Sequence, residues 1–242
     1  MWWDYKHYLA ENQISTIAGD IAICQEFSNY NHGQKSRGKN IDNLAIRTGQ
    51  AIGSWMIKSS SNSEHAAIVS RGWGMGDDTG RICDANVGDT SDGRRFRGIA
   101  IRKWTPRPAY IYRCNVEALR NEASRISQEI ATRVGASATS GGRYDWNGAT
   151  KCVLKFKYVD AESTAFVDKC YDFAYNHDVN KELPGMFCSE FVVVCYMLAA
   201  RHERCELGNL NVDPRAIEPK ALQSLLERNS RFTRVGRPYE DG

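Results

Sequence analysis

Several features that would assign a protein quickly to a functional class are missing from this sequence. Its eight cysteines include no Cys-x-x-Cys pair, so a zinc ribbon and a thioredoxin-like redox site lose their main support. The longest apolar run, Phe191 to Ala200, is ten residues long. A membrane-spanning helix needs about 20. Lysine and arginine form no dense run, and the net charge is only +3. We therefore expect no metal or organic cofactor, no integral membrane association and no nucleic-acid partner.

The N-terminus also lacks the pattern of a secretory leader. Met1 is followed by Trp2-Trp3-Asp4 rather than by a basic segment and an apolar stretch. We expect the protein to be synthesised in the cytoplasm, and any export to use another route.

Basic residues gather at only two places, residues 94–97 and Arg102-Lys103. Short clusters of this kind are common on protein surfaces, so we interpret them as a solvated loop and strand edge. The alternative is a weak attraction to an acidic polymer or a membrane surface.

The length and composition predict one domain with a real core, since the chain has 242 residues, of which 42% are apolar and 25% charged. The order of the predicted elements indicates an α+β fold, with helices around a small antiparallel sheet. Residues 25–62 form a probable insertion or lid, and residues 229–242 a polar tail. The predicted helices cover residues 1–16, 41–57, 116–134, 166–175, 187–202 and 219–228, and the predicted strands cover 17–25, 65–69, 81–86, 98–104 and 110–114.

One cysteine differs from the others in its position. A turn at Pro184-Gly185 leads into a strongly apolar helix, and Cys188 stands at the start of that helix. Unpaired N–H groups and the positive end of the helix dipole favour a thiolate there, and a thiolate is the form that attacks carbonyl carbons. The alternative for Cys188 is a buried cysteine that opens a core helix. For the other cysteines, burial as small hydrophobic residues is the expectation.

A histidine and an aspartate complete the candidate constellation. His65 begins an apolar strand after a polar segment, where it is placed like a general base at the edge of a sheet. Asp84 alternates with apolar residues on the next predicted strand. If the two strands pair, Asp84 can lie beside His65 and fix its tautomer. The alternatives are a core histidine with satisfied hydrogen bonds and an ordinary strand-end aspartate.

Together these stretches resemble a known group, the permuted papain-like branch of the NlpC-type superfamily that contains YiiX-like proteins and lecithin:retinol acyltransferase. In that branch the histidine precedes the cysteine. The resemblance runs from about residue 17 to 220. It rests on Ala18-Gly19-Asp20-Ile21-Ala22, His65-Ala66-Ala67-Ile68-Val69, Ile82-Cys83-Asp84-Ala85, Tyr144-Asp145-Trp146-Asn147-Gly148 and Phe187-Cys188-Ser189-Glu190-Phe191-Val192.

The resemblance implies a circularly permuted papain-like (NlpC-type) fold and a cysteine hydrolase. Cys188 would be the nucleophile, His65 its base and Asp84 the third member, although that third slot often holds another residue type. Glu190 would have a supporting role near the site, the alternative being a carboxylate stabilised by the helix N-terminus. Asp145 is expected to be a structural cap or turn residue.

The resemblance also bears on substrate and partners. It implies amide bonds, and we favour those of peptidoglycan stem peptides. An acyl-lipid hydrolase or acyltransferase using the same cysteine, and a non-catalytic binding module, are the alternatives. A hydrolase of this type is similar to antibacterial effectors exported by type VI-like secretion. That similarity implies a secretion apparatus and an immunity protein as partners, and action in the periplasm of a target bacterium.

Overall fold

A six-stranded sheet is the frame of the protein, and each neighbouring pair of its strands is antiparallel. The computed structural model describes residues 15–25, 63–72, 80–89, 95–103, 109–136, 145, 148–149, 161–176 and 182–236. The strand order is β4-β3-β2-β1-β5-β6. The strands are β1 (Ile21–Gln25), β2 (Ser63–Arg71), β3 (Arg81–Asp89), β4 (Arg95–Lys103), β5 (Ala109–Cys114) and β6 (Phe232–Gly236).

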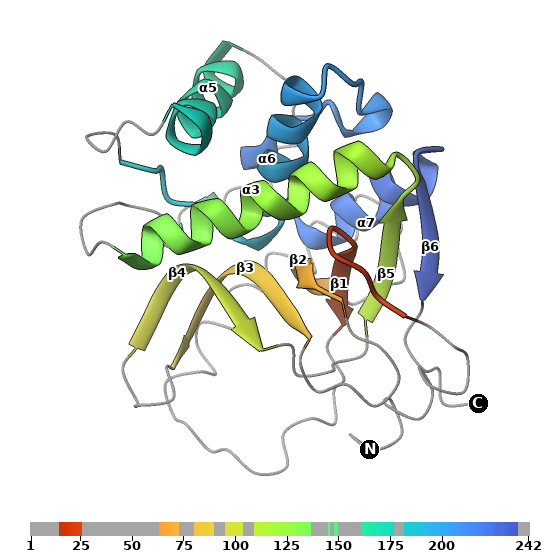
Figure 1. Ribbon diagram of the computed structural model, residues 1–242, viewed down its shortest axis with the longest axis horizontal. Helices are drawn as coiled ribbons and strands as arrows, with labels where there is room; N and C mark the ends of the chain where they lie inside the picture. Colours follow the sequence, from red (N-terminus) through yellow and green to blue (C-terminus); the bar gives the residue numbers. More distant parts are fainter. Residues whose placement is uncertain are drawn as a thin grey trace.

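Helices α3, α5 and α6 gather on one side of this sheet (Figure 1). Within the described residues the helices are α3 (Glu117–Ala136), α5 (Ala161–Tyr175), α6 (Cys188–His202) and α7 (Pro219–Arg228), with short 3-10 turns η2 (Gly208–Leu210) and η3 (Pro214–Ala216). The predicted α+β class with a small antiparallel sheet is confirmed. None of the described helices is both long and apolar enough to cross a membrane.

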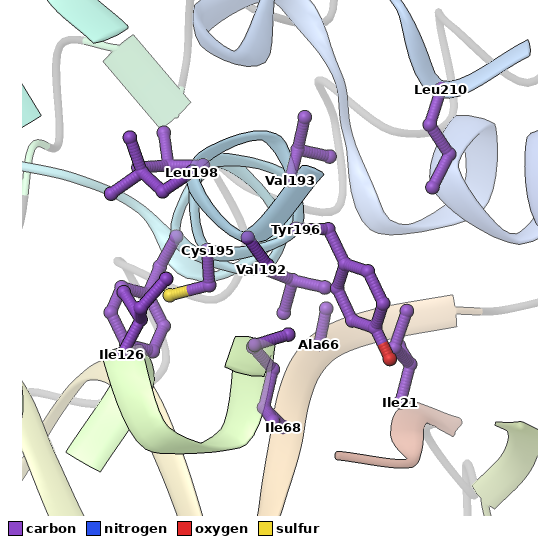
Figure 2. Packing of buried hydrophobic residues seen from close by; sticks show 14 of the residues in the cluster. Ile21, Ala66, Ile68, Ile126, Val192, Val193, Cys195, Tyr196, Leu198 and Leu210 are labelled. Carbon is purple, nitrogen blue, oxygen red and sulfur yellow. The ribbon is translucent and has the colours of Figure 1, made fainter. Parts of the chain in front are cut away.

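Helix α6 is the centre of the core. Twelve of its fifteen residues are buried, which marks it as an internal helix rather than a surface one. Figure 2 shows it end-on, with Val192 and Tyr196 facing Ala66 of β2 and Ile21 of β1. Each fully buried aliphatic side chain here contributes about 1.5–3 kcal/mol.

Helix α3 lies across the sheet beside α6 and shows the predicted amphipathic pattern. Leu119, Ala123, Ile126 and Ile130 are buried on one face, while Arg125 is exposed on the other. The three- and four-residue spacing places the apolar side chains on one stripe of a 3.6-residue helix. Figure 2 shows Ile126 close to Cys195 of α6.

A polar turn fixes the start of β1. Gly19 has a φ of +88°, and its carbonyl accepts a hydrogen bond of 2.5 Å from the Tyr196 hydroxyl. Asp20 is fully buried and accepts from the Arg113 guanidinium at 2.9 and 2.8 Å. Because this turn occupies residues 17–20, β1 begins at Ile21 and not at residue 17 as predicted.

The segment predicted as a polar tail contains a strand. Residues 232–236 form β6, which pairs with β5 at the edge of the sheet. Phe232 is its one strongly buried apolar side chain, while Thr233 and Arg234 are exposed. Charged and polar residues are typical of edge strands, and here they hide the strand pattern in the sequence. The predicted helices at 1–16 and 41–57 and the predicted insertion or lid at 25–62 fall almost entirely outside the described residues.

A buried carboxyl group at the start of α7 should make the stability of the fold depend on pH. Glu218 is 3% exposed, and neither carboxylate oxygen has a hydrogen-bond partner within the described part of the chain. Burial raises the pKa of Glu218 to about 7, against a smaller opposing effect of Lys220. The stability that comes from the raised pKa is fully present below the ordinary pKa near 4.5 and is lost as pH rises through about 7.

Glu218→Gln removes this ionisation. We expect the melting temperature of the variant to exceed that of the wild type at pH 8.5, and the gap to shrink toward zero at pH 5. Exposed Glu206→Gln is the matched control, with no pH-dependent gap. Thermal unfolding at both pH values measures the difference, and an equal gap at both would contradict the assignment.

Candidate active site

The sheet brings His65 and Asp84 together. His65 lies on β2 and Asp84 on β3, and these strands pair with Ile68 opposite Cys83. Because side chains alternate along a strand, the side chains of His65 and Asp84 lie on the face opposite to that of Ile68 and Cys83. They therefore share one face of the sheet. The distance from His65 Nε2 to Asp84 Oδ2 is 2.8 Å. The conditional prediction that strand pairing would bring Asp84 beside His65 therefore holds geometrically.

Cys188 enters from the helix side, at the first residue of α6. Phe187 before it is extended, with φ −99° and ψ 173°, so the helix starts abruptly after the turn. The side chain of Cys188 reaches β2, where it interacts with the His65 ring and the backbone of Ala66. The residue is 4% exposed, whereas the His65 side chain is 19% exposed. Of the pair, the histidine is thus the more open to solvent.

The thiol and the imidazole shift each other toward a charged pair. Burial alone would raise the pKa of Cys188, but the charge of His65, a hydrogen bond from its ring, and the N–H groups of Ala66 and Ser189 lower it below the usual value of 9.0. Burial likewise opposes the imidazolium, yet Cys188 and Asp84 raise the pKa of His65 well above 6.5. Both shifts favour the pair of a thiolate and an imidazolium over the neutral pair.

The ring orientation follows from the hydrogen bonds. Since Nε2 of His65 is bonded to Asp84, Nδ1 is the ring nitrogen that remains for the thiol. A histidine held in this way can take the thiol proton on Nδ1 while Asp84 keeps the other N–H in place. The thiol, the imidazole and the carboxylate thus follow one another in contact, which is the order that a nucleophile, a base and an orienting group require.

Asp84 has further neighbours. Arg102 of β4 places its Nε 3.0 Å from Oδ1 of Asp84, and the Asn86 amide donates to Oδ2 at 3.4 Å. Asp84 and Ala100 are opposite each other in the β3–β4 register, so Arg102 is the diagonal neighbour on the same face. The sequence analysis placed Arg102 in a solvated basic cluster, and the structure instead places its guanidinium against Asp84. The sequence places Arg102 on a strand, but it does not give the register of that strand against β3.

Glu190 supports the start of α6. Its Oε2 accepts a hydrogen bond of 3.2 Å from the Phe187 N–H, the residue directly before the thiol. Burial, with the carboxylates of Asp145 and Asp213 adding to it, raises the pKa of Glu190 well above 4.5. Glu190 therefore anchors the turn as a buried, readily protonated carboxyl.

A second anchor ties the same turn to the C-terminal part of the chain. The Ser189 hydroxyl donates to the Ile217 carbonyl at 2.6 Å, and both groups are buried. Ile217 lies between η3 and α7, so this bond fixes α6 against the segment that follows it. Asp145 acts as the predicted turn residue, since its Oδ1 accepts from the Gly148 N–H at 2.9 Å. Asp20, in the turn before β1, forms an ion pair with Arg113 of β5.

Four other buried cysteines behave in the opposite way from Cys188. Burial raises the pKa of Cys83 to about 11 and also raises the pKa values of Cys114, Cys170 and Cys195. No disulfide links any of the cysteines that the structure describes. In contrast to these four thiols, Cys188 has a lowered pKa, because the His65 ring and the N–H groups of Ala66 and Ser189 act on its sulfur.

Comparison of the chain with protein-family models, curated proteins and solved structures gave no match. Over the described residues, the His, Cys, Asp and Glu side chains form no group of three or more that could hold a metal ion.

Thiol reactivity tests the charged pair directly. We expect iodoacetamide to modify Cys188 faster at pH 7 than Cys83, Cys114, Cys170 or Cys195, because the lowered pKa gives Cys188 the larger thiolate fraction while burial raises the pKa values of the other four. His65→Ala should slow this modification by about tenfold or more, since each unit of pKa changes the thiolate fraction tenfold.

Peptide mapping by mass spectrometry measures the rate at each cysteine. Cys205, which is partly exposed, is the internal reference, and its rate should not change in His65→Ala. Equal rates at Cys188 in wild type and variant would contradict the thiolate–imidazolium assignment.

Proposed function

We propose that this chain is a cysteine hydrolase with a circularly permuted papain-like fold, in which Cys188 is the nucleophile and His65 its base. One observation carries the proposal. The buried Cys188 thiol and the His65 imidazole shift each other's pKa values in opposite directions, with Asp84 hydrogen-bonded to the far side of the ring. The chain order supports the permuted arrangement, since the histidine strand β2 precedes the cysteine helix α6.

The first half of the reaction forms a thioester. The Cys188 thiolate attacks the carbonyl carbon, and the carbonyl electrons move onto oxygen. The N–H groups at the start of α6 are the nearest donors for that oxyanion. The tetrahedral intermediate then collapses, the carbon–nitrogen bond breaks, and His65 gives its Nδ1 proton to the leaving amine.

The second half restores the enzyme. Neutral His65 takes a proton from water, which attacks the thioester carbon. The thiolate leaves as the carbon–sulfur bond breaks, and a carboxylic acid is released. Asp84 stays hydrogen-bonded to Nε2 throughout and stabilises each imidazolium state. Since both a thiolate and an imidazolium are needed, hydrolysis should fall at low and at high pH.

For the substrate we propose an amide bond of a peptidoglycan stem peptide. The support is the resemblance of the stretches around His65, Asp84 and Cys188 to the NlpC-type superfamily. The same constellation could also transfer an acyl group from a lipid ester, because the attack on an ester carbonyl uses identical groups. The choice between the two bonds is an outcome of the experiment below.

Digestion of purified peptidoglycan tests the hydrolase. We expect wild type to release new peptide fragments and Cys188→Ala to release none, a loss of at least about a thousandfold because the nucleophile is gone. Cys205→Ala is the matched control and should keep the wild-type rate. Mass spectrometry of the fragments identifies the bond.

Fragments from Cys188→Ala at the wild-type rate would end the proposal. If neither protein releases fragments, fatty-acid release from phospholipid vesicles is measured next with the same three proteins. Cys188-dependent release would redirect the proposal to acyl lipids, and its absence would leave the binding-module alternative.

An antibacterial effector role is a further proposal that the resemblance suggests. It predicts growth arrest when the protein is directed to the bacterial periplasm, where stem peptides are accessible, and none when it stays in the cytoplasm. Cys188→Ala should be harmless in both compartments. Growth curves measure the effect, and equal toxicity of wild type in both compartments would contradict it.

A further inference from the structure

The candidate site continues one strand beyond Asp84. From α6 to β4, four groups of alternating charge follow one another: the Cys188 thiolate, the His65 imidazolium, the Asp84 carboxylate and the Arg102 guanidinium. Each adjacent pair is in contact. The third member is almost completely buried, with 2% of its side chain exposed, and its two oxygens face different partners.

Arg102 meets the oxygen that His65 leaves open. Oδ2 of Asp84 is 2.8 Å from His65 Nε2, while Oδ1 is 3.0 Å from Arg102 Nε. A buried carboxylate is costly unless a cation and hydrogen bonds compensate it. With only the imidazole as partner, the carboxylate would lose its compensation whenever His65 gives up its proton during turnover. Arg102 carries a charge that does not titrate in the working range.

We propose that Arg102 is the positioning residue of this site, which holds the Asp84 carboxylate turned toward His65 Nε2 throughout the reaction. The inference rests on the proposed role of Cys188 and His65. Arg102 acts through Asp84, which it contacts with its guanidinium. Its position on β4 makes the edge strand part of the catalytic assembly, because the guanidinium reaches Asp84 only in the observed β3–β4 register.

The charges around Asp84 are few among the described residues. His65 faces it from β2 and Arg102 from β4, while Cys188 of α6 stands behind the histidine. Cys83 precedes it on β3, and burial, with a smaller effect from the Asp84 charge, raises the pKa of that thiol to about 11. Cys83 therefore stays neutral, and Arg102 is the one permanent cation in contact with Asp84 there.

The pH profile of Cys188 alkylation tests the inference without any substrate. Rates with iodoacetamide are measured from pH 4 to 9 in wild type and Arg102→Gln. We expect the acid limb of the Arg102→Gln profile to move to higher pH, with a rate at pH 6 about tenfold lower, because an Asp84 side chain that Arg102 no longer holds can turn away from His65 and then stabilises the imidazolium less. Arg102→Lys should restore most of the wild-type profile.

Two controls separate positioning from general damage. Arg234→Gln removes an arginine from β6, the opposite edge strand, where the guanidinium pairs with Glu227 at 3.7 Å, and should leave the profile unchanged. In an Asp84→Asn background, Arg102→Gln should change the rate less than about twofold, since a residue that acts only through Asp84 has nothing left to act on.

Each result decides something. A wild-type profile in Arg102→Gln, or a full effect in the Asp84→Asn background, overturns the inference and leaves the proposed hydrolase intact. Slow alkylation of wild-type Cys188 at every pH below 8 overturns the proposed function itself. If Arg102→Gln does not fold, the Asp84→Asn/Arg102→Gln double variant, which removes both members of the ion pair, is compared with Asp84→Asn, and a difference of more than about twofold overturns the inference.

Discussion

The meeting of the first residue of α6 with β2 is the contact on which the rest of this protein depends. It places the Cys188 sulfur against the His65 ring and the Ala66 backbone, with only 4% of the cysteine exposed. Two charges in such a place are expensive to desolvate. From the His65 ring the contacts continue outward through Asp84 to Arg102, so the buried carboxylate has a cationic partner on its second oxygen. The site is an extended ion-pair network built across three strands and one helix.

The fold supplies the rigidity that this network requires. Helix α6 is held by its apolar side chains against β1 and β2, as the packing of Val192 and Tyr196 shows (Figure 2). Its first turn is fixed separately, by Glu190 on the Phe187 N–H and by Ser189 on the Ile217 carbonyl. Neither bond touches the reacting groups. Both restrict where the sulfur can lie, and a displacement of about 1 Å in such a site costs about a hundredfold in rate.

The contrast between the cysteines shows how local the activation is. Cys195 lies two turns further along the same helix as Cys188, yet burial raises its pKa well above 9.0. Cys83 lies one residue from Asp84, and burial raises its pKa as well. The low dielectric of the core suppresses ionisation of a thiol everywhere except where cationic and N–H partners converge. Activation therefore belongs to the position of Cys188 at the helix start and not to cysteine content.

Sequence alone determined the class of the fold and the identity of its central parts. Hydrophobic periodicity located the helices α3, α6 and α7 and the strands β1 to β5, because burial on one face leaves a regular spacing in the chain. It also singled out Cys188 and His65, since a cysteine after a turn and a histidine before an apolar strand are local patterns. The β6 strand was missed because an edge strand with one buried residue, Phe232, leaves almost no periodic signal.

Only the tertiary structure decided what lies beside what. The approach of Asp84 to His65 depends on how β2 pairs with β3, and the approach of Arg102 to Asp84 depends on the register of β4, where a slip of one residue would turn the guanidinium to the other face. Register is a property of paired strands and is not written in either strand separately. The same holds for the ionisation of Cys188, which follows from partners 123 positions away in the chain at His65 and from the burial that surrounds them.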